Sequence, residues 1–272
     1  MGVTDAARLL AAYDSQLRCG AETPGAVSVA RQGPLLLATL AGGYGFITYR
    51  DLGGAGLDAI GRVVSEALAH FTADAAIGQV EWKTRGHDHA PGLHEALLEN
   101  GFVPAEPESI MLGEARALAV DVALPDGVTL RRVTEEADVR AMAAMQGEVF
   151  GDPEDSGERA NAVLRRLARG DEIELWVAEA DGNIVSAGRL DPVAGTDFAG
   201  IWGGATRAAR RGRGIYRALT AERARAALRM GKTYINSDST EYSRPILERA
   251  GFVKVSTTTP YNWKRVDGDG SR

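Results

Sequence analysis

Apolar positions along the chain follow two periods, and together they predict a mixed α/β fold. Apolar residues at every third or fourth position predict helices, and short apolar runs bounded by glycine or polar turns predict strands. The first half carries helical patterns at 5–17, 57–71 and 93–99 and strand patterns at 27–30, 35–40, 44–49, 77–82 and 109–112. The second half carries helical patterns at 135–149, 156–169, 215–229 and from about residue 243, with strand patterns at 128–133, 173–178, 184–190, 197–206, 233–237, 253–256 and 261–266.

The stretch 201–229 holds the most informative local chemistry. It begins as a strand containing Gly203 and Gly204, continues through the turn Arg211-Gly212-Arg213-Gly214, and ends as a helix. Two glycines in the turn allow successive backbone N–H groups to point the same way, at a helix N-terminus where the macrodipole is positive. The turn is therefore predicted to bind an anion.

Arginines concentrate around this turn. Residues 207–229 contain eight arginines and a single acid, Glu222, in a chain whose formal net charge is −6 at pH 7. Such a local excess of positive charge favours a phosphate carried by a ligand. Arg211 and Arg213 could instead form a solvated face, but their position at a helix start favours the ligand. Nucleic acid is disfavoured as a partner, because the chain is acidic overall and only Tyr216 interleaves with the arginines.

Composition limits what the turn can belong to. With 272 residues, 44% apolar and 25% charged, the chain is expected to be soluble and globular, with one or two domains. Cys19 is the only cysteine, which excludes an internal disulfide framework, and no leader pattern is present at the start. We therefore expect a cytoplasmic protein. The longest apolar run, near 35–41, is too short to cross a bilayer, so no membrane partner is expected.

The two halves share an order of elements, which indicates an internal repeat. The runs 96–103 and 246–253 both end in Gly-Phe-Val, and each follows a strand, a helix and another strand in the same order. In the first half, however, the Gly-rich turn at 53–56 lacks arginine. Only the second copy is therefore predicted to keep an intact phosphate turn.

Domain boundaries follow from this repeat. The segment 115–127 contains a Pro-Asp-Gly turn signal and is predicted to separate the copies. The expected domains are 1–117, without the phosphate turn, and 118–266, with it. The tail 267–272 is too polar and Gly-rich to pack, and we expect it to be disordered.

At this point the residues carry a family resemblance. The turn Arg211-Gly212-Arg213-Gly214-Ile215-Tyr216, followed by Leu247-Glu248-Arg249-Ala250-Gly251-Phe252, resembles the signature of the GCN5-related N-acetyltransferase (GNAT) superfamily, Arg/Gln-x-x-Gly-x-Gly/Ala with a later Gly-Phe. It covers 128–266 well and 5–115 in outline. It implies an α/β (α+β) fold with two GNAT-like domains in tandem. Each would have a mixed, mostly antiparallel twisted sheet, flanked by helices and containing a splayed central strand pair.

The resemblance also implies acetyl-CoA as cosubstrate and assigns residues to it. Gly204, Ala205 and Thr206 would contact the pantetheine arm, and Thr240 stands where relatives often have an Asn near the cofactor. The phosphates would lie on the turn and first helical residues, which are Arg211, Gly212, Arg213, Gly214, Ile215, Tyr216 and Arg217. Gly203 and Gly204 equally suit a plain β-bulge, and both interpretations stay open.

The sequence departs from the family pattern where protons are transferred. Gly200 occupies the strand position where some relatives have a Glu base, and Leu247 the position where many have a Tyr acid. Tyr216 stands where the motif usually ends in Gly or Ala. As substitutes we consider Tyr242 for the acid and Asp238 for a water-mediated base, although both also suit ordinary loop or capping roles.

Other candidate residues give weaker signals. His87-Asp88-His89, with His94 nearby, is interpreted as a solvent-exposed polar loop rather than a metal site, because no Cys or carboxylate falls at a recognised ligand spacing. Trp202 shares a strand face with Gly200 and suits either the core or the wall of an acceptor pocket. The acceptor would be shaped by the loop 150–157 and by a terminal hairpin near 257–262.

The functional hypothesis is an acetyl-CoA-dependent N-acetyltransferase that acts on an amine by direct attack, without a metal. The acceptor amine is expected to be a small molecule. The alternatives are a non-catalytic acyl-CoA sensor and a protein N-acetyltransferase. Three roles stay open for the N-terminal copy, which could roof the acceptor site, widen it, or form the contacts of a homodimer.

Overall fold

The computed structural model describes residues 3–265, and these fall into two compact units. The N-terminal unit contains 3–110, 238–244 and 254–265, and the C-terminal unit contains 111–237 and 245–253. The units do not follow the expected ranges 1–117 and 118–266, because the last strand packs with the N-terminal unit. The tail expected at 267–272 lies outside the described residues. Between residues 3 and 265, no helix is both long and apolar enough to span a bilayer.

The N-terminal unit is built on a mixed sheet. Its elements are α1 (Val3–Gln16), the 3-10 turn η1 (Cys19–Glu22), β1 (Ser28–Gln32), β2 (Leu35–Leu40), β3 (Tyr44–Tyr49), α2 (Leu57–Thr72), β4 (Gln79–Arg85), α3 (Leu93–Glu99) and β5 (Val103–Pro104). Strands β1, β2 and β3 form an antiparallel meander, and β3 runs parallel to β4. The sheet is completed by β12 (Val253–Lys264), which pairs antiparallel with β4 and with β5.

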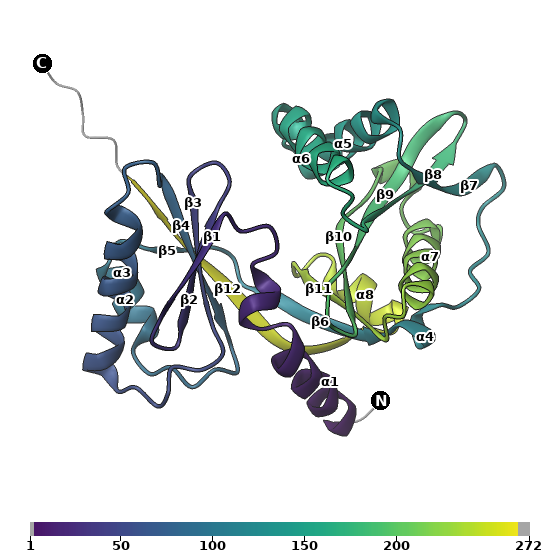
Figure 1. Cartoon of the computed structure of the whole chain (residues 1–272). Helices are drawn as coiled ribbons and strands as arrows, with labels where there is room; N and C mark the ends of the chain where they lie inside the picture. The colour runs from purple at the N-terminus through teal and green to yellow at the C-terminus, as the bar shows by residue number, and fades with distance from the viewer. Residues whose placement is uncertain (1–2, 266–272) are drawn as a thin grey trace, which may run out of the picture. The chain divides into compact units, whose positions relative to one another are not determined.

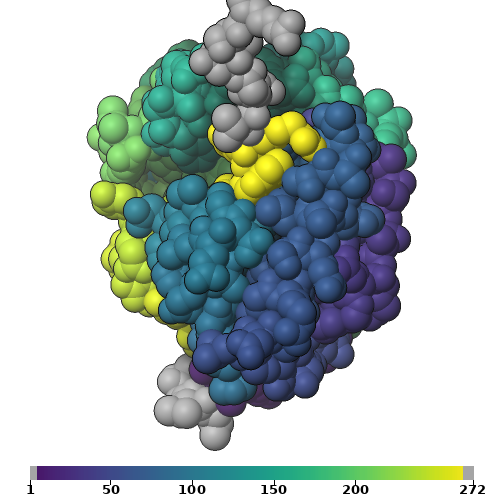
Figure 2. All heavy atoms as spheres, turned by 90° about the vertical axis from the view of Figure 1, so that its left-hand side faces the viewer, coloured from purple at the N-terminus to yellow at the C-terminus, as the bar shows by residue number. Residues whose placement is uncertain are grey.

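Helix α2 anchors the core of this unit. It buries Ile60, Val64, Ala67 and Phe71, whose helical spacing places them on one face against the sheet. Burying each large apolar side chain contributes about 1.5–3 kcal/mol. Figure 2 shows α2 and α3, in blue, covering the face turned to the viewer. The apolar patterns at 57–71 and 93–99 therefore correctly predicted the two helices that cover this face.

The C-terminal unit is also a mixed sheet between helices. Its elements are β6 (Glu108–Glu114), which begins in the N-terminal unit, α4 (Ala115–Leu118), β7 (Val128–Val133), α5 (Glu136–Phe150), η2 (Pro153–Asp155), α6 (Ser156–Ala168), β8 (Glu174–Ala180), β9 (Asn183–Pro192), β10 (Phe198–Thr206), η3 (Ala208–Arg210), α7 (Ile215–Arg229), β11 (Tyr234–Ser239) and α8 (Arg244–Ala250). The strand order is β6-β11-β10-β9-β8-β7. From β10 to β7 each pairing is antiparallel, whereas β10 runs parallel to β11.

Each face of this sheet has its own core. On the face covered by α5 and α6, Met142, Met145 and Val163 pack with strand residues such as Val177. On the face covered by α7, helical alanines pack against Ile201, and α8 adds its own apolar residues. Figure 1 shows α5 and α6 on one side of the sheet and α7 on the other. The mixed, mostly antiparallel sheet flanked by helices is confirmed.

The repeat seen in the sequence has a matching backbone geometry. A glycine with positive φ follows the end of each of the helices α3 and α8, Gly101 at +79° and Gly251 at +109°. The next residue is a buried Phe whose N–H bonds back to a leucine carbonyl, with 3.0 Å from Phe102 N to Leu97 O and 3.0 Å from Phe252 N to the Leu247 carbonyl. This is the hydrogen bond that closes a helix C-terminus when a left-handed residue follows it.

The prediction of a terminal hairpin near 257–262 is wrong. These residues lie within the single strand β12, which pairs with β4 from Thr258 to Lys264. The Thr-Thr-Thr-Pro run suggested a turn, but pairing with β4 keeps it extended. The short elements α4 and β5 were not predicted, because they are too short to show a period.

Candidate active site

Strand β10 loses one of its neighbours halfway along. It pairs with β9 along its length, but its parallel pairing with β11 covers only Phe198 to Gly200. The register with β9 shifts between Trp202 and Ala205, where Gly203 has φ of +62° and Gln146 of α5 donates a 2.6 Å hydrogen bond to its carbonyl. The structure thus shows a bulge at the glycine pair and confirms the splayed strand pair. After Gly200, the described chain offers β10 no partner on the β11 side.

The residues expected to contact the pantetheine arm lie on this unpaired stretch. Gly204 is exposed, Ala205 is buried in the core under α5, and Thr206 is half-buried. The Thr206 hydroxyl lies 2.8 Å from the Ser186 hydroxyl of β9. An unpaired strand edge with exposed glycines offers backbone N–H and C=O groups to an extended ligand.

The turn between β10 and α7 has the predicted shape. Gly212 and Gly214 have φ of +73° and +80°, a left-handed conformation that strains other residues. Gly214 is the N-cap of α7 without a side-chain cap, and Ile215 is buried. Within residues 3–265, no hydrogen bond uses the backbone N–H groups of 212–217. These donors converge at a helix N-terminus, which is an anion-binding geometry.

Many of the arginines near the turn are already engaged by protein groups. Acidic side chains pair with Arg207, Arg210 and Arg225, and Arg223 is buried. Arg211 donates from Nε to the Thr206 carbonyl at 3.0 Å. Arg213 and Arg217 are exposed and have no ion pair within the described residues. The charge available to an anion is therefore smaller than the arginine count suggests, and it lies mainly on Arg211, Arg213 and Arg217.

The strand position expected for a base is covered by an indole. A Cβ added at Gly200 would lie 2.8 Å from Cε2 and 3.0 Å from Cζ2 of Trp202. The half-buried Trp202 side chain therefore lies directly against Gly200. In the same row of the sheet, Gly200 is flanked by Asp191 of β9 and Asn236 of β11. The Asp191 carboxylate forms ion pairs with Arg166 and with Arg189, so two positive charges already balance its negative charge.

The other candidates for proton transfer lie at the end of β11 or just after it, where the chain passes into the N-terminal unit. Asp238, Thr240 and Tyr242 belong to the segment 238–244, which packs within the N-terminal unit. Asp238 forms a 2.8 Å ion pair with Lys83. Although burial alone would lower the pKa of Lys83, the Asp238 charge raises it above its ordinary value.

These side chains differ in exposure. The Tyr242 side chain is 93% exposed. Thr240 is exposed, with its hydroxyl 3.2 Å from that of Ser243. Leu247 of α8, which occupies the family's acid position, is buried in the core of the C-terminal unit. Asp238 lies on β11 itself, whereas Thr240 and Tyr242 follow the end of this strand.

The N-terminal unit has a matching strand opening, but its turn has different chemistry. Strand β3 pairs parallel with β4 only from Tyr44 to Ile47, so these strands also diverge. In the turn that follows, Asp51 accepts a 2.7 Å hydrogen bond from the Gly53 N–H. The Asp51 carboxylate thus takes a donor that a phosphate would use and adds negative charge beside it.

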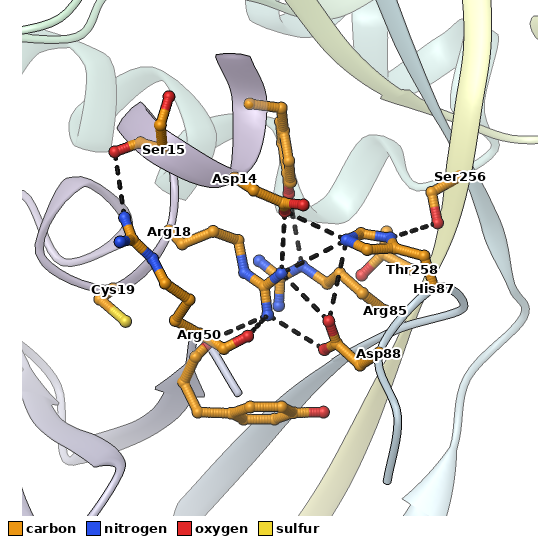
Figure 3. Close-up of polar contacts among 12 residues, drawn as sticks. Asp14, Ser15, Arg18, Cys19, Arg50, Arg85, His87, Asp88, Ser256 and Thr258 are labelled. Carbon is orange, nitrogen blue, oxygen red and sulfur yellow. Dashed lines mark hydrogen bonds and ion pairs between the residues drawn. The ribbon is translucent and has the colours of Figure 1, made fainter. Parts of the chain in front are cut away.

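This opening contains an arginine that the sequence did not single out (Figure 3). Arg18 lies just after α1, and its side chain is 1% exposed. It donates to the carbonyl of Tyr49 at 2.8 Å and to that of Arg50 at 3.2 Å, both at the end of β3. Nearby, Glu22 accepts hydrogen bonds from Thr48 and Arg85. The Arg18 side chain therefore occupies two backbone carbonyls of this opening.

The loop expected to be solvent-exposed contributes to the same network. Asp88, with a side chain only 7% exposed, accepts two hydrogen bonds from Arg18 at 3.2 and 3.0 Å. His87 lies 2.6 Å from the Ser256 hydroxyl and 3.1 Å from Asp14. The expectation of an exposed loop is wrong for Asp88, because Arg18 draws it into the interior. Among residues 3–265, no group of three or more His, Cys, Asp or Glu side chains could hold a metal ion.

Comparisons with known proteins agree with this geometry. A model of the acetyltransferase (GNAT) family matches residues 139–252. A GCN5-related N-acetyltransferase from Kribbella flavida shares the fold with a TM-score of 0.69 at 17% identity, over 98% of this chain and 97% of that one. A tandem GNAT protein from the clavulanic acid biosynthesis pathway gives a TM-score of 0.60 at 15% identity, over 91% and 86%. A GCN5-related N-acetyltransferase from Sphaerobacter thermophilus gives 0.57 at 19% identity, over 87% and 75%. No curated protein matches the sequence significantly.

Proposed function

We propose that this protein binds acetyl-CoA and transfers the acetyl group to an amine, because residues 139–252 match a model of the acetyltransferase (GNAT) family. The observation that carries the proposal is the run of backbone N–H groups at 212–217, which have no acceptor within the described residues and lie next to the unpaired edge of β10. A diphosphate needs convergent donors, and an amide-bearing arm needs a free strand edge. The convergent N–H donors and the free strand edge both lie on the continuous segment formed by β10, the turn and α7.

The side chains around this surface fit the same ligand. Arg213 and Arg217 place positive charge at the turn, and Gly203 and Gly204 leave β10 without side chains. The backbone of 204–206 would hold the pantetheine amides, while the N–H groups of 212–217 would hold the diphosphate. When bound, acetyl-CoA supplies an activated acyl thioester. A backbone N–H of β10 would stabilise the negative charge that develops on the carbonyl oxygen.

The acceptor is proposed to be an amine on the face of β10 that carries Trp202. Direct attack requires the neutral amine, whose proton is lost as the C–N bond forms. From the sequence, Asp238 remains the proposal for a water-mediated base, and Tyr242 is one of two candidates for the acid. Thr240 remains a proposed cofactor contact. We further propose a cytoplasmic location.

The N-terminal unit is proposed to be a GNAT-like copy that no longer binds CoA. Arg18 satisfies the carbonyls at the end of β3, and Asp51 occupies an N–H of the turn. Both groups would compete with the pantetheine arm and the diphosphate. Its proposed roles are to roof or widen the acceptor site, or to form the contacts of a homodimer.

Calorimetry with CoA tests the binding proposal. The charge reversal Arg213→Glu is expected to weaken CoA binding at least about tenfold, because a unit charge about 6 Å from a phosphate contributes about 0.7–3 kcal/mol. Arg169→Glu is the matched control, since Arg169 directly follows α6 and its side chain is 60% exposed. Among the described residues, Asp171 is its only ion-pair partner. Absence of CoA binding by the wild type, or equal losses in the two variants, would refute the proposal.

Thiol release with a panel of amines then tests the reaction. One observation favours a second candidate function, a non-catalytic acyl-CoA sensor. Trp202 covers Gly200, the position where a base is expected. CoA binding without thiol release from acetyl-CoA for any amine would favour the sensor. Thiol release that depends on an amine and is lost in Arg213→Glu would favour the transferase.

A further inference from the structure

The phenol of Tyr216 lies against β10 at Gly204. Tyr216 is the second residue of α7, and an ideal Cβ at Gly204 would lie 2.5 Å from the Tyr216 hydroxyl oxygen, 2.7 Å from Cε2 and 3.0 Å from Cζ. The hydroxyl therefore lies on the stretch of β10 that has no β11 partner. Within residues 3–265, no hydrogen bond involves this hydroxyl. A polar group is thus placed, without a partner, where the proposed cofactor arm approaches.

A buried cation lies over the same ring. The Arg223 side chain is fully buried, and its Cζ is 5.6 Å from the Tyr216 ring centroid. Among the described residues it donates only to neutral oxygens, at 3.3 Å to the Leu219 carbonyl, 3.2 Å to the Thr220 hydroxyl and 3.5 Å to the Arg189 carbonyl. No carboxylate of the described residues forms an ion pair with it. Because a buried charge without a counter-ion is costly, its position beside a phenol needs an explanation.

We propose that Tyr216 donates a proton to the sulfur of the departing coenzyme. This inference rests on the proposed function. As the amine nitrogen forms the C–N bond, the C–S bond breaks and its electron pair goes to sulfur, which takes the Tyr216 hydroxyl proton. The amine proton goes to water, and the phenolate recovers a proton from solvent. The Arg223 charge stabilises the negative charge that the ring carries between these events.

This assignment accounts for two departures from the family pattern. Leu247 is in the core and cannot donate a proton, whereas Tyr216 stands where the motif usually ends in Gly or Ala. The bulky residue is accommodated because its contact on β10 is Gly204, which has no side chain. Acid catalysis by a positioned side chain contributes roughly 10² to 10⁴-fold to a rate.

The first test measures binding. Coenzyme A and desulfo-coenzyme A, which lacks the thiol, are compared by calorimetry at pH 9, above the reference thiol pKa of about 8.5. The wild type is expected to bind coenzyme A about tenfold more tightly than the desulfo compound, because a hydrogen bond to a charged acceptor is a strong one. Tyr216→Phe keeps the ring and is expected to lose this preference while its affinity for desulfo-coenzyme A stays unchanged. Tyr44→Phe, on β3 of the other unit, is the matched control.

The second test measures turnover. Tyr216→Phe is expected to lower kcat by roughly 10²-fold, with KM for acetyl-CoA within about threefold of the wild type. If Tyr242→Phe lowered kcat and Tyr216→Phe did not, the inference would be overturned. It would also be overturned if the wild type bound coenzyme A and Tyr216→Phe kept the preference over the desulfo compound. No binding of coenzyme A by the wild type would instead remove the proposed function and this inference together.

Discussion

Replacing Arg18 by methionine should destabilise the N-terminal unit strongly. Arg18 and Asp88 have side chains only 1% and 7% exposed, and they share hydrogen bonds of 3.2 and 3.0 Å. Without Arg18, the buried Asp88 carboxylate keeps only His87, 3.7 Å away, as an ion-pair partner among the described residues. Removing one partner of a buried ion pair costs about 3–5 kcal/mol. The carbonyls of Tyr49 and Arg50 would lose their donor as well. We therefore expect a loss of at least about 3 kcal/mol of local stability.

Hydrogen exchange followed by mass spectrometry is the appropriate assay, because a chain with two units need not unfold in one step. In peptides that cover β3 and β4, a loss of about 3 kcal/mol raises the exchange rate about 150-fold. Peptides from the C-terminal unit should exchange as in the wild type. Arg140→Met is the control, since Arg140 and Glu136 have side chains 48% and 65% exposed and such surface pairs contribute about 0–1 kcal/mol.

The double variant Arg18→Met/Asp88→Leu keeps the prediction testable if the single variant fails to fold. Replacing both partners by apolar residues removes the unpaired charge, so the double variant should be more stable than Arg18→Met alone. An increase of less than about fivefold in exchange for Arg18→Met would refute the reasoning. A double variant as unstable as the single one would also refute it, because the cost would then not come from the unpaired Asp88.

Two further predictions concern the C-terminal unit. Gly204→Ala should cost about 1–3 kcal/mol, because the new methyl would lie 2.5 Å from the Tyr216 hydroxyl. In a double-mutant cycle read by urea unfolding, the cost should fall below about 1 kcal/mol in a Tyr216→Ala background, and equal costs in both backgrounds would contradict the contact. For pH, hydrogen bonds from Arg131 hold the pKa values of Asp138 and Glu179 below their ordinary values. Their contribution to stability is therefore present above the unfolded pKa values near 4 and is lost as the pH falls through the folded values. Unfolding midpoints from pH 6 to pH 2 should fall less steeply in Arg131→Met than in the wild type, and parallel curves would exclude this explanation.

Local signals predicted the elements best where turns bound them. The strands at 44–49 and 128–133 and the helix at 93–99 have the predicted limits, because glycine, proline or polar residues flank each one. The strand β12 was divided in two because Pro260 and the threonines before it suggest a turn. Its true length depends on pairing with β4, about 175 positions earlier in the sequence, which no local pattern reports.

In the candidate site, too, the sequence predicted local features but not contacts between distant parts of the chain. The turn at 211–214 was predicted because its chemistry is local, with two glycines and several arginines in a few positions. The contact between Tyr216 and Gly204 was missed, because it requires the path of the chain through η3. Arg18 was missed for a related reason, since its partner Asp88 lies 70 positions away and a single arginine after a helix has no distinctive pattern.

The two strand openings explain how similar topologies could acquire different functions. When two parallel strands diverge, backbone groups on the facing edges lose their partners and must find others. After Ile47 in the N-terminal unit, Arg18 supplies donors to the carbonyls of β3, and Asp51 takes a donor of the turn. After Gly200 in the C-terminal unit, no side chain of the described residues bonds to the N–H groups of the turn. A ligand that offers both carbonyls and phosphates would satisfy the second opening and would have to displace a buried ion pair to enter the first.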